Sequence, residues 1–277
     1  MTNPGNMSDL WKRLRFVFFA ILVYRIGTHI PIPGIDPAKL EAFFTDNGDG
    51  TILQMFNLFS GGALERMSIF ALNVVPYISS AIIMQLFSNS IPYLQELKKD
   101  GQAGRNKITQ YTRYGTAVLA FIQASALAAT LSAQEFAYVP GPSFFVPAVF
   151  SVVAGTMFLM WLGEQVSERG IGNGISIIIA TSILTGIPGA IGQALTLSSK
   201  GELSILLLLG IGLLSMAIIA AVVYVERGQR RITVNYAQRQ QGRRLMQAQT
   251  SHLPFKVNMA GVIPAIFAST FLLFPAS

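Results

Sequence analysis

Basic side chains crowd the stretch between Glu226 and Lys256, where seven Lys or Arg accompany a single acid. They are Arg227, Arg230, Arg231, Arg239, Arg243, Arg244 and Lys256. Guanidinium groups donate paired hydrogen bonds to phosphate or carboxylate oxygens, so this stretch is suited to docking a large anionic partner. Attraction to anionic lipid, worth about 1 kcal/mol for each basic residue near a membrane surface, is the alternative.

Residues for catalysis or metal binding form no recognisable pattern in the sequence. The two histidines, His29 and His252, lie far apart, cysteine is absent, and there is no His-Glu-x-x-His run. The glycine-rich run Arg169–Gly174 follows an apolar helix instead of a strand, which predicts a tight turn and not a nucleotide site. We therefore predict a protein that is not an enzyme and that uses no metal or other cofactor.

Composition indicates a polytopic membrane protein. Hydrophobic residues make up 52% of the chain and charged residues 12%, whereas an average soluble domain has about 25% charged residues. Several apolar runs approach the roughly 20 residues that a spanning helix needs. They include Ala148–Leu162, Ile175–Leu195, Leu203–Val225 and Met259–Pro275. The fold class predicted is an all-α membrane bundle.

Hydropathy predicts seven spans with a cytoplasmic N-terminus. They are residues 16–32, 67–90, 114–132, 147–166, 175–195, 203–225 and 258–276. Basic residues gather in the N-terminal tail, in the connection from Ile91 to Arg113 and in the 226–257 loop, whereas the segments 31–51, 132–146 and 196–202 carry only Lys39 and Lys200. The basic connections are expected on the cytoplasmic side, because Lys and Arg are enriched in cytoplasmic loops.

Five spans are predicted before the short connection at 196–202. Because five is odd, the sixth span enters the membrane from the side opposite to the first, as an inverted repeat of five-span units requires. On this basis residues 1–195 form an N-terminal half with spans one to five. Residues 196–277 then begin a C-terminal half with spans six and seven and the basic loop at 226–257. We expect three further spans in a complete protein.

The segment Ile52–Arg66 is apolar but too short to span a membrane. Both of its flanks are predicted on the outer side. It is either a half-helix inside a protein-lined cavity or an amphipathic helix on the outer leaflet, and the residues themselves favour neither.

The predicted span centres hold almost no ionisable side chains, which argues against ion-coupled chemistry within the membrane. Glu164 lies near the cytoplasmic end of its span, where it can reach headgroups or pair with Arg169. Pro76 and Pro188 fall inside predicted spans and are expected to kink them. A passive pore fits these features best, and a small-solute secondary transporter with inverted repeats is the alternative; a membrane enzyme would need a catalytic pair that the sequence lacks.

The chain closely resembles the SecY family of bacterial protein-conducting channel subunits along its whole length. The runs that carry the resemblance are Arg25–Gly27, Pro31–Asp36, Met55–Asn57, Phe59–Leu64, Gln110–Gly115, Met160–Gln165, Glu168–Gly174, Glu226–Arg231 and Lys256–Gly261. The resemblance implies a ten-span clamshell of two inverted halves, of which this chain covers spans one to seven. It also implies a protein translocase pore that passes unfolded secretory polypeptides across the bacterial plasma membrane and releases transmembrane segments sideways into lipid.

By matching position, the resemblance implies an apolar pore ring and a plug. The ring residues are Val74, Ile78, Ile175, Ile179 and Ile266. Val74 departs from the isoleucine that is more usual at its position. The segment at about 52–66 matches the plug, a half-helix in the outer funnel, with Phe56, Asn57, Phe59, Ser60, Gly61 and Gly62. This match favours the cavity interpretation of that segment.

The resemblance further implies a lateral gate, formed by spans two and three opposite span seven, and a cytoplasmic docking surface. The polar gate positions are Gln85, Asn173 and Ser269. The docking residues are Lys98, Lys99, Arg105, Lys107, Arg239, Arg243 and Arg244, with the last two expected to make direct contacts. Tyr236 and nearby glutamines favour a structured, protruding loop there.

The partners that the resemblance implies begin with the small membrane subunits SecE and SecG. The SecA motor ATPase and the ribosome would dock on the cytoplasmic side. Signal peptides and nascent chains would enter the pore, and membrane lipids would surround it.

Overall fold

The computed structural model describes residues 5–36, 39, 62–63, 66–134, 136–139, 141–201, 204–235, 240–241, 244–245, 250–256 and 258. The chain forms two compact units, residues 1–191 and 192–277. Of the sequence predictions, the span at 258–276 lies outside the described residues except for Asn258, and most of the segment 52–66 also lies outside them.

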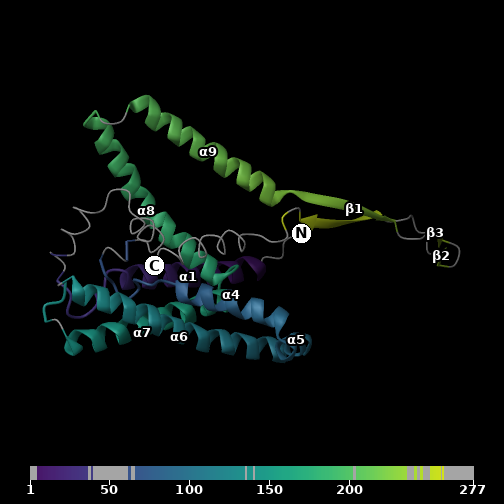
Figure 1. The fold of residues 1–277 in the computed structure, drawn as a ribbon. Helices are drawn as coiled ribbons and strands as arrows, with labels where there is room; N and C mark the ends of the chain where they lie inside the picture. Colours follow the sequence, from purple (N-terminus) through teal and green to yellow (C-terminus); the bar gives the residue numbers. More distant parts are fainter. Residues whose placement is uncertain are drawn as a thin grey trace. The chain divides into compact units, whose positions relative to one another are not determined.

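The first unit is a bundle of helices (Figure 1). Its helices are α1 (Gly5–Gly27), α4 (Val75–Ser90), α5 (Pro92–Lys99), α6 (Gln102–Ala133), α7 (Pro142–Arg169) and the first part of α8 (Gly174–Ser199). The all-α fold class is confirmed for this unit. Helix α6 begins well before the predicted span at 114, because a polar first segment continues the helix beyond its apolar part.

Helices α6 and α7 pack side by side as an antiparallel pair (Figure 1). At one end, Leu131 of α6 and Phe144 of α7 are buried in the same apolar cluster. At the other end, Arg113 of α6 pairs with Glu164 of α7. Small side chains line the buried stripe of α6, including Ala120, Ala124 and Ala128, which allow close helix approach.

Three connections meet through their backbones at the end of the bundle where α1 finishes. Ile32 N–H donates to the Met67 carbonyl (2.8 Å), and Ile69 N–H donates to the Ile30 carbonyl (3.0 Å). Asp36 N–H donates to the Phe136 carbonyl (2.9 Å). Irregular backbone thus finds partners inside the protein, as it must where a bundle excludes water.

The second predicted span, 67–90, begins too early. Helix α4 starts only at Val75, and turns occupy residues 66–74. Met67 and Asn73 have positive φ angles of 40° and 49°, a conformation that cannot continue a right-handed helix. Pro76 therefore lies in the first turn of α4, where no backbone donor is needed, and the predicted kink at Pro76 is wrong. Pro188 does lie inside α8.

In the part of the chain that the structure describes, four helices are long and apolar enough to cross a membrane: α6, α7, α8 and α9 (Ile205–Arg227). Helix α1 ends at Gly27, not at residue 32, since the chain turns at Thr28–Ile30. Helix α4 has only 16 residues. None of the described α9 side chains is buried within its own unit.

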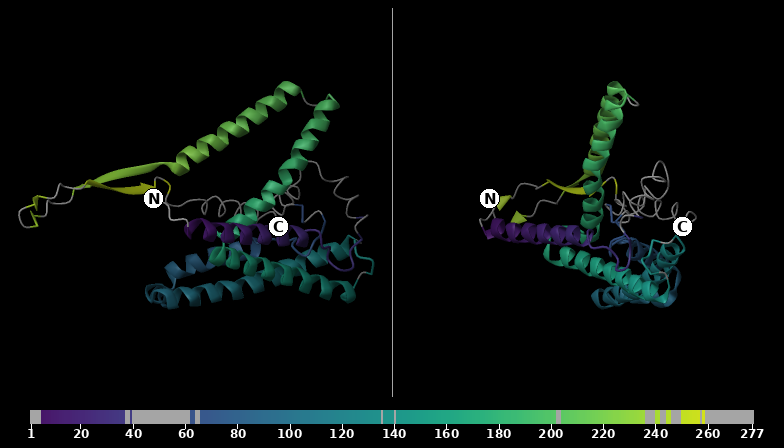
Figure 2. Two further views of the ribbon diagram at one scale, coloured as in Figure 1. Left: turned by 180° about the vertical axis from the view of Figure 1, so that it is seen from behind. Right: turned by 90° about the vertical axis from the view of Figure 1, so that its left-hand side faces the viewer.

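The second unit contains an antiparallel β-hairpin that the sequence analysis did not predict (Figure 2). Strand β1 (Gln229–Asn235) follows directly on α9 and pairs with β4 (Thr250–Lys256), in a register that places Gln229 opposite Lys256. Ile232 lies opposite Leu253, a cross-strand apolar pair of the kind that stabilises sheets. Short strands β2 (Gln240–Gln241) and β3 (Arg244–Leu245) also pair with each other.

A close backbone contact at Gly155 of α7 generates a stability prediction. A Cβ atom added there would overlap the Ile69 carbonyl oxygen. Gly155→Ala should therefore lower the free energy of unfolding by about 1–3 kcal/mol, because backbone must shift to relieve the overlap. Thermal unfolding in detergent would measure the loss.

Gly189→Ala is the matched control, since a Cβ built at Gly189 in α8 meets no side chain or other segment among the described residues. That substitution should leave stability unchanged or raise it by up to about 1 kcal/mol. Equal effects of the two alanines would contradict the packing at Gly155.

Candidate pore ring, gate and docking surface

Four of the five predicted pore-ring residues lie in the described part of the chain, and all four belong to one apolar cluster. Val74 is buried in it, and Ile78, Ile175 and Ile179 pack against it. Val74 and Ile78 are one helical turn apart at the start of α4, as are Ile175 and Ile179 on α8. Ile266 lies outside the described residues. The structure therefore brings two separate helices together at the predicted ring, and the role of these residues as a ring stays a prediction.

The start of α8 is fixed by side-chain capping. The Asn173 Oδ1 atom accepts hydrogen bonds from the backbone N–H groups of Ile175 (3.0 Å) and Ser176 (3.3 Å). Gly174 N–H donates to Ser167 Oγ of α7 (2.8 Å). An Asn cap satisfies backbone donors that a helix start leaves open, and it sets where Ile175 enters the apolar cluster.

Asn173, which was predicted to be a polar gate residue, therefore caps the start of α8. Gln85 is exposed on α4, and its carbonyl accepts a hydrogen bond from the Ser88 hydroxyl (2.8 Å). Ser269 lies outside the described residues. The gate assignment of all three residues stays a prediction.

The plug residues fall almost wholly outside the described chain. Phe56, Asn57, Phe59, Ser60 and Gly61 lie there, and only Gly62 is described. Just after Gly62, Ala63 is fully buried in the cluster that contains Val74. The segment that leaves the predicted plug therefore enters the same core as the predicted ring.

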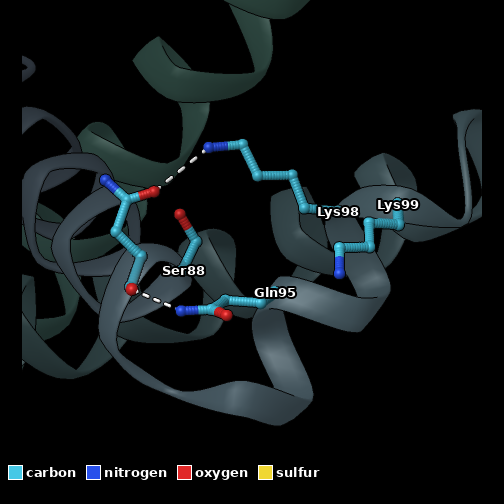
Figure 3. Close-up of a pocket in the computed structure, with 5 residues that line it drawn as sticks. Ser88, Gln95, Lys98 and Lys99 are labelled. Atoms are coloured by element: carbon cyan, nitrogen blue, oxygen red, sulfur yellow. Dashed lines mark hydrogen bonds between the residues drawn. The ribbon is translucent and has the colours of Figure 1, made fainter.

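The first group of predicted docking residues surrounds the end of α5 and the start of α6. Lys98, Lys99, Arg105 and Lys107 are all exposed. Lys98 and Lys99 line an open pocket of about 290 Å³ together with Ser88, Asn89 and Gln95 (Figure 3). Lys98 Nζ donates to Asn89 Oδ1 (3.2 Å), and Gln95 Nε2 donates to the Asn89 carbonyl.

The second group lies in the β-hairpin unit. Arg244 is part of β3, where it pairs with Gln241 of β2. Arg239 and Arg243 lie outside the described residues. Figure 1 shows β2 and β3 at the end of the hairpin away from α9. The strands explain how the basic loop can be structured: residues 232–234 are β-branched, a signal that the hydropathy reading passed over.

The charge pair nearest to the predicted spans joins α6 to α7. Arg113 Nε donates to Glu164 Oε1 (2.9 Å) and Arg113 Nη2 donates to Glu164 Oε2 (2.7 Å). The Glu164 side chain is only 18% exposed, and that of Arg113 is 48% exposed. The partner of Glu164 is therefore Arg113 and not Arg169, because Arg113 faces it across the antiparallel pair whereas Arg169 follows it on the same helix.

Three buried polar residues escaped the sequence analysis. Tyr24 of α1, Asn73 in the turn before α4, and Ser182 of α8 form hydrogen bonds inside the cluster of the predicted ring. Asn73 and Ser182 are 109 positions apart, and Tyr24 and Ser182 are 158 apart. No local pattern links residues at such separations, so only their polarity within apolar segments could have drawn attention to them.

Comparison with known proteins gives consistent matches. The SecY family model matches residues 68–277. The protein translocase subunit SecY of Pseudomonas aeruginosa is 61% identical over 273 residues, which cover 99% of this chain and 62% of that relative. The chain thus spans less than two thirds of the length of this relative.

Solved structures with the same fold include one described as the structure of a protein-conducting channel. It has a TM-score of 0.65 and 19% identity, and the match covers 95% of this chain and 56% of that one. Sec61 in the canine ribosome–channel complex from the endoplasmic reticulum has a TM-score of 0.63 and 18% identity, with the same coverage.

The Arg113–Glu164 pair can be tested by a double-mutant cycle with Arg113→Met and Glu164→Gln. Each single variant should lose about 1–3 kcal/mol of stability, because the remaining polar group is partly buried and unpaired. The double variant should lose less than the sum of the two. Thermal unfolding in detergent measures all three.

The exposed pair of Arg13 and Asp9 serves as the control, since both side chains are at least half exposed and their atoms are 3.3 Å apart. Arg13→Ala should cost less than about 1 kcal/mol. Additive losses for Arg113 and Glu164 would contradict a direct, paired contact.

Proposed function

The chain belongs to the SecY family, and on this premise we propose that it is the pore-forming part of a protein translocase. Unfolded secretory polypeptides pass through its pore across the plasma membrane, and apolar segments leave the pore sideways into lipid. The proposed orientation places the N-terminus and the β1–β4 hairpin in the cytoplasm, in agreement with the distribution of Lys and Arg.

The observation that carries this proposal is the meeting of Val74 and Ile78 with Ile175 and Ile179 around one apolar cluster. An apolar constriction resists wetting, so it can block ions at rest without a fixed partner. It also binds a passing polypeptide weakly, since apolar side chains offer no hydrogen bonds that would hold one sequence in place. These properties suit a pore that must accept many different chains.

The scarcity of charge supports a pore over a small-solute transporter. Coupled transporters keep ionisable groups near the middle of the membrane, where the solute and ion are bound. Among the described residues, the pair of Arg113 and Glu164 lies toward the ends of α6 and α7 and is neutralised internally. A pore of this kind has no energy source of its own and depends on partners.

We propose that the two basic surfaces receive these partners on the cytoplasmic side. One consists of Lys98, Lys99, Arg105 and Lys107, and the other of Arg239, Arg243 and Arg244. The ribosome and the SecA motor ATPase are the proposed occupants, and SecE and SecG are the proposed membrane partners. The likeness in fold to Sec61 from a ribosome–channel complex supports the ribosome as one of them.

We also propose that residues 52–66 form a plug that closes the outer side of the pore, and that Gln85, Asn173 and Ser269 border a lateral gate. The burial of Ala63 beside the ring cluster supports the plug, because it anchors the end of that segment at the pore. Residues 1–195 and 196–277 would then belong to two inverted halves of a larger channel.

The ring is tested by placing polar side chains in it. Ile78→Ser and Ile179→Ser in the complete subunit should raise the resting ion conductance of reconstituted channels about tenfold or more, because a polar constriction wets more readily. Ile83→Ser and Ile187→Ser, at exposed positions on the same two helices, should leave the resting conductance unchanged. A resting conductance equal to that of the wild type in both ring variants would contradict the assignment of Ile78 and Ile179 to the ring.

The docking surface is tested by reversing charge at Arg243 and Arg244. Arg243→Glu with Arg244→Glu should weaken ribosome binding at least tenfold, and wild-type binding should fall steeply as salt rises, because phosphate contacts release counterions. The control is the double variant Arg230→Glu with Arg231→Glu. It changes the net charge by the same amount as the first double variant, but its two positions lie in β1, next to the proposed membrane helix α9. Attraction to anionic lipid would respond alike to both pairs, and that result would contradict the assignment.

A further inference from the structure

The β1–β4 hairpin has one apolar face. Residues directly opposite each other in an antiparallel pair lie on the same face, and successive residues of a strand alternate between the two faces. Ile232 lies opposite Leu253, and Arg230 lies opposite Phe255. Val234, two residues after Ile232, shares their face. The four apolar side chains of Ile232, Val234, Leu253 and Phe255 are called the apolar face below.

The other face of the hairpin is polar. Its members are Gln229, Arg231, Thr233, His252, Pro254 and Lys256. Such an alternation is typical of an antiparallel sheet that packs one face against protein and leaves the other face in water.

The apolar face is left open by the described residues. Ile232, Leu253 and Phe255 are 47%, 46% and 44% exposed. A hairpin of two strands is marginally stable in water by itself, because it has no core. Neighbouring large apolar side chains that stay exposed mark a surface for contact with a partner.

The charge around the apolar face is basic throughout. From Arg227 to Lys256 the sequence contains no Asp or Glu. Arg230 and Arg231 are exposed on β1, and Lys256 is exposed on β4. Interfaces combine an apolar centre with a polar rim, and charges across them are complementary. The surface that fits this face therefore has an apolar centre with carboxylates around it.

Lipid lies too far from the centre of the apolar face to cover it. Only Gly228 separates the end of α9 from β1, and Figure 1 shows the strand continuing away from the end of the helix. At about 3.3 Å per residue, Ile232 lies roughly 13 Å beyond Gly228. The headgroup region on each side of a membrane is only about 5–8 Å thick. If α9 spans the membrane, Ile232 and Leu253 therefore stand in the cytoplasm.

Ribosomal RNA suits the apolar face less well than protein does. Proteins hold RNA with basic groups on its phosphates and with aromatic or guanidinium planes on its bases. Ile232, Val234 and Leu253 offer neither a hydrogen-bond donor nor a planar group. The residues of the loop that suit phosphates are Arg243 and Arg244, which come between the two strands in the sequence.

We infer that the apolar face of the β1–β4 hairpin docks a protein whose contact surface has an apolar centre and carboxylates at its rim. Of the two cytoplasmic partners proposed above, the motor ATPase fits this chemistry, because it is protein throughout. The loop then has two contact regions, with Arg243 and Arg244 for RNA and the apolar face for the motor. This inference rests on the proposed function and deepens its docking surface.

The test measures how tightly the purified SecA motor ATPase binds the complete subunit in nanodiscs of zwitterionic lipid. Ile232→Thr with Leu253→Thr removes apolar surface and keeps a strand-forming residue at both positions. This double variant should bind the motor about tenfold more weakly. The factor should be the same at low and high sodium chloride, because salt screens charges and not apolar contacts.

Thr233→Ser with His252→Gln is the matched control. These two residues form the neighbouring cross-strand pair and lie on the polar face. The control variant should bind the motor as tightly as the wild type does.

A hairpin that opened would imitate the loss of a contact, so all variants are also compared with the base of the hairpin locked. Gln229 and Lys256 lie opposite each other, and the chain contains no cysteine. Gln229→Cys with Lys256→Cys can therefore form a single disulfide across the two strands. The tenfold difference should persist in this locked background.

The inference is overturned if the locked variant with Ile232→Thr and Leu253→Thr binds the motor as tightly as the locked wild type. Lower thermal stability with unchanged motor binding would show that the subunit itself covers the face. Weaker binding of protein-free ribosomal RNA, with motor binding unchanged, would make RNA the occupant. A wild-type subunit that binds neither the motor nor ribosomes would refute the proposed docking function itself.

Discussion

A polar group inside a membrane span must find its hydrogen-bond partner within the protein, because hydrocarbon offers none. This constraint accounts for the arrangement of the first unit. Its irregular connections pair with one another through their backbones, as Ile32 does with Met67. The largely shielded carboxylate of Glu164 accepts two hydrogen bonds from the guanidinium of Arg113 on the neighbouring helix. Three of its buried polar side chains, Tyr24, Asn73 and Ser182, are joined by hydrogen bonds.

Under the proposed function, the same constraint also bears on how the resting pore is held. Apolar side chains such as Ile78 and Ile179 exclude water, but they pack without directional preference and would tolerate small displacements. Hydrogen bonds to Ser182 add direction, because Tyr24 and Asn73 reach it from two other segments of the first unit. The apolar side chains of the proposed ring and the hydrogen bonds of Ser182 thus lie in the same part of the first unit. Energy for opening would arrive from partners at the basic cytoplasmic surfaces.

Hydropathy and charge predicted most of the helical fold, because long apolar runs such as that of α9 have few other possible structures. The same approach placed the start of α4 too early, since an apolar composition does not reveal the left-handed turns at Met67 and Asn73. It missed strands β1 and β4, whose residues are polar overall. It also gave Glu164 the wrong partner, because a contact between helices depends on their relative rotation. The family resemblance named the ring residues, whose role stays a prediction, whereas the hydrogen bonds of Ser182 could be found only from the coordinates.

The central claim is that polypeptides in transit pass between the starts of α4 and α8. The sequence contains no cysteine, so a single cysteine placed in it reports one position without background from these residues. A secretory polypeptide arrested in transit, with one cysteine of its own, should form a disulfide with Cys introduced at Ile78 or Ile179. It should form none with Cys at Ile83 or Ile187, which lie exposed on the same helices. Crosslinking at the exposed positions, with none at Ile78 and Ile179, would contradict a pore at this place.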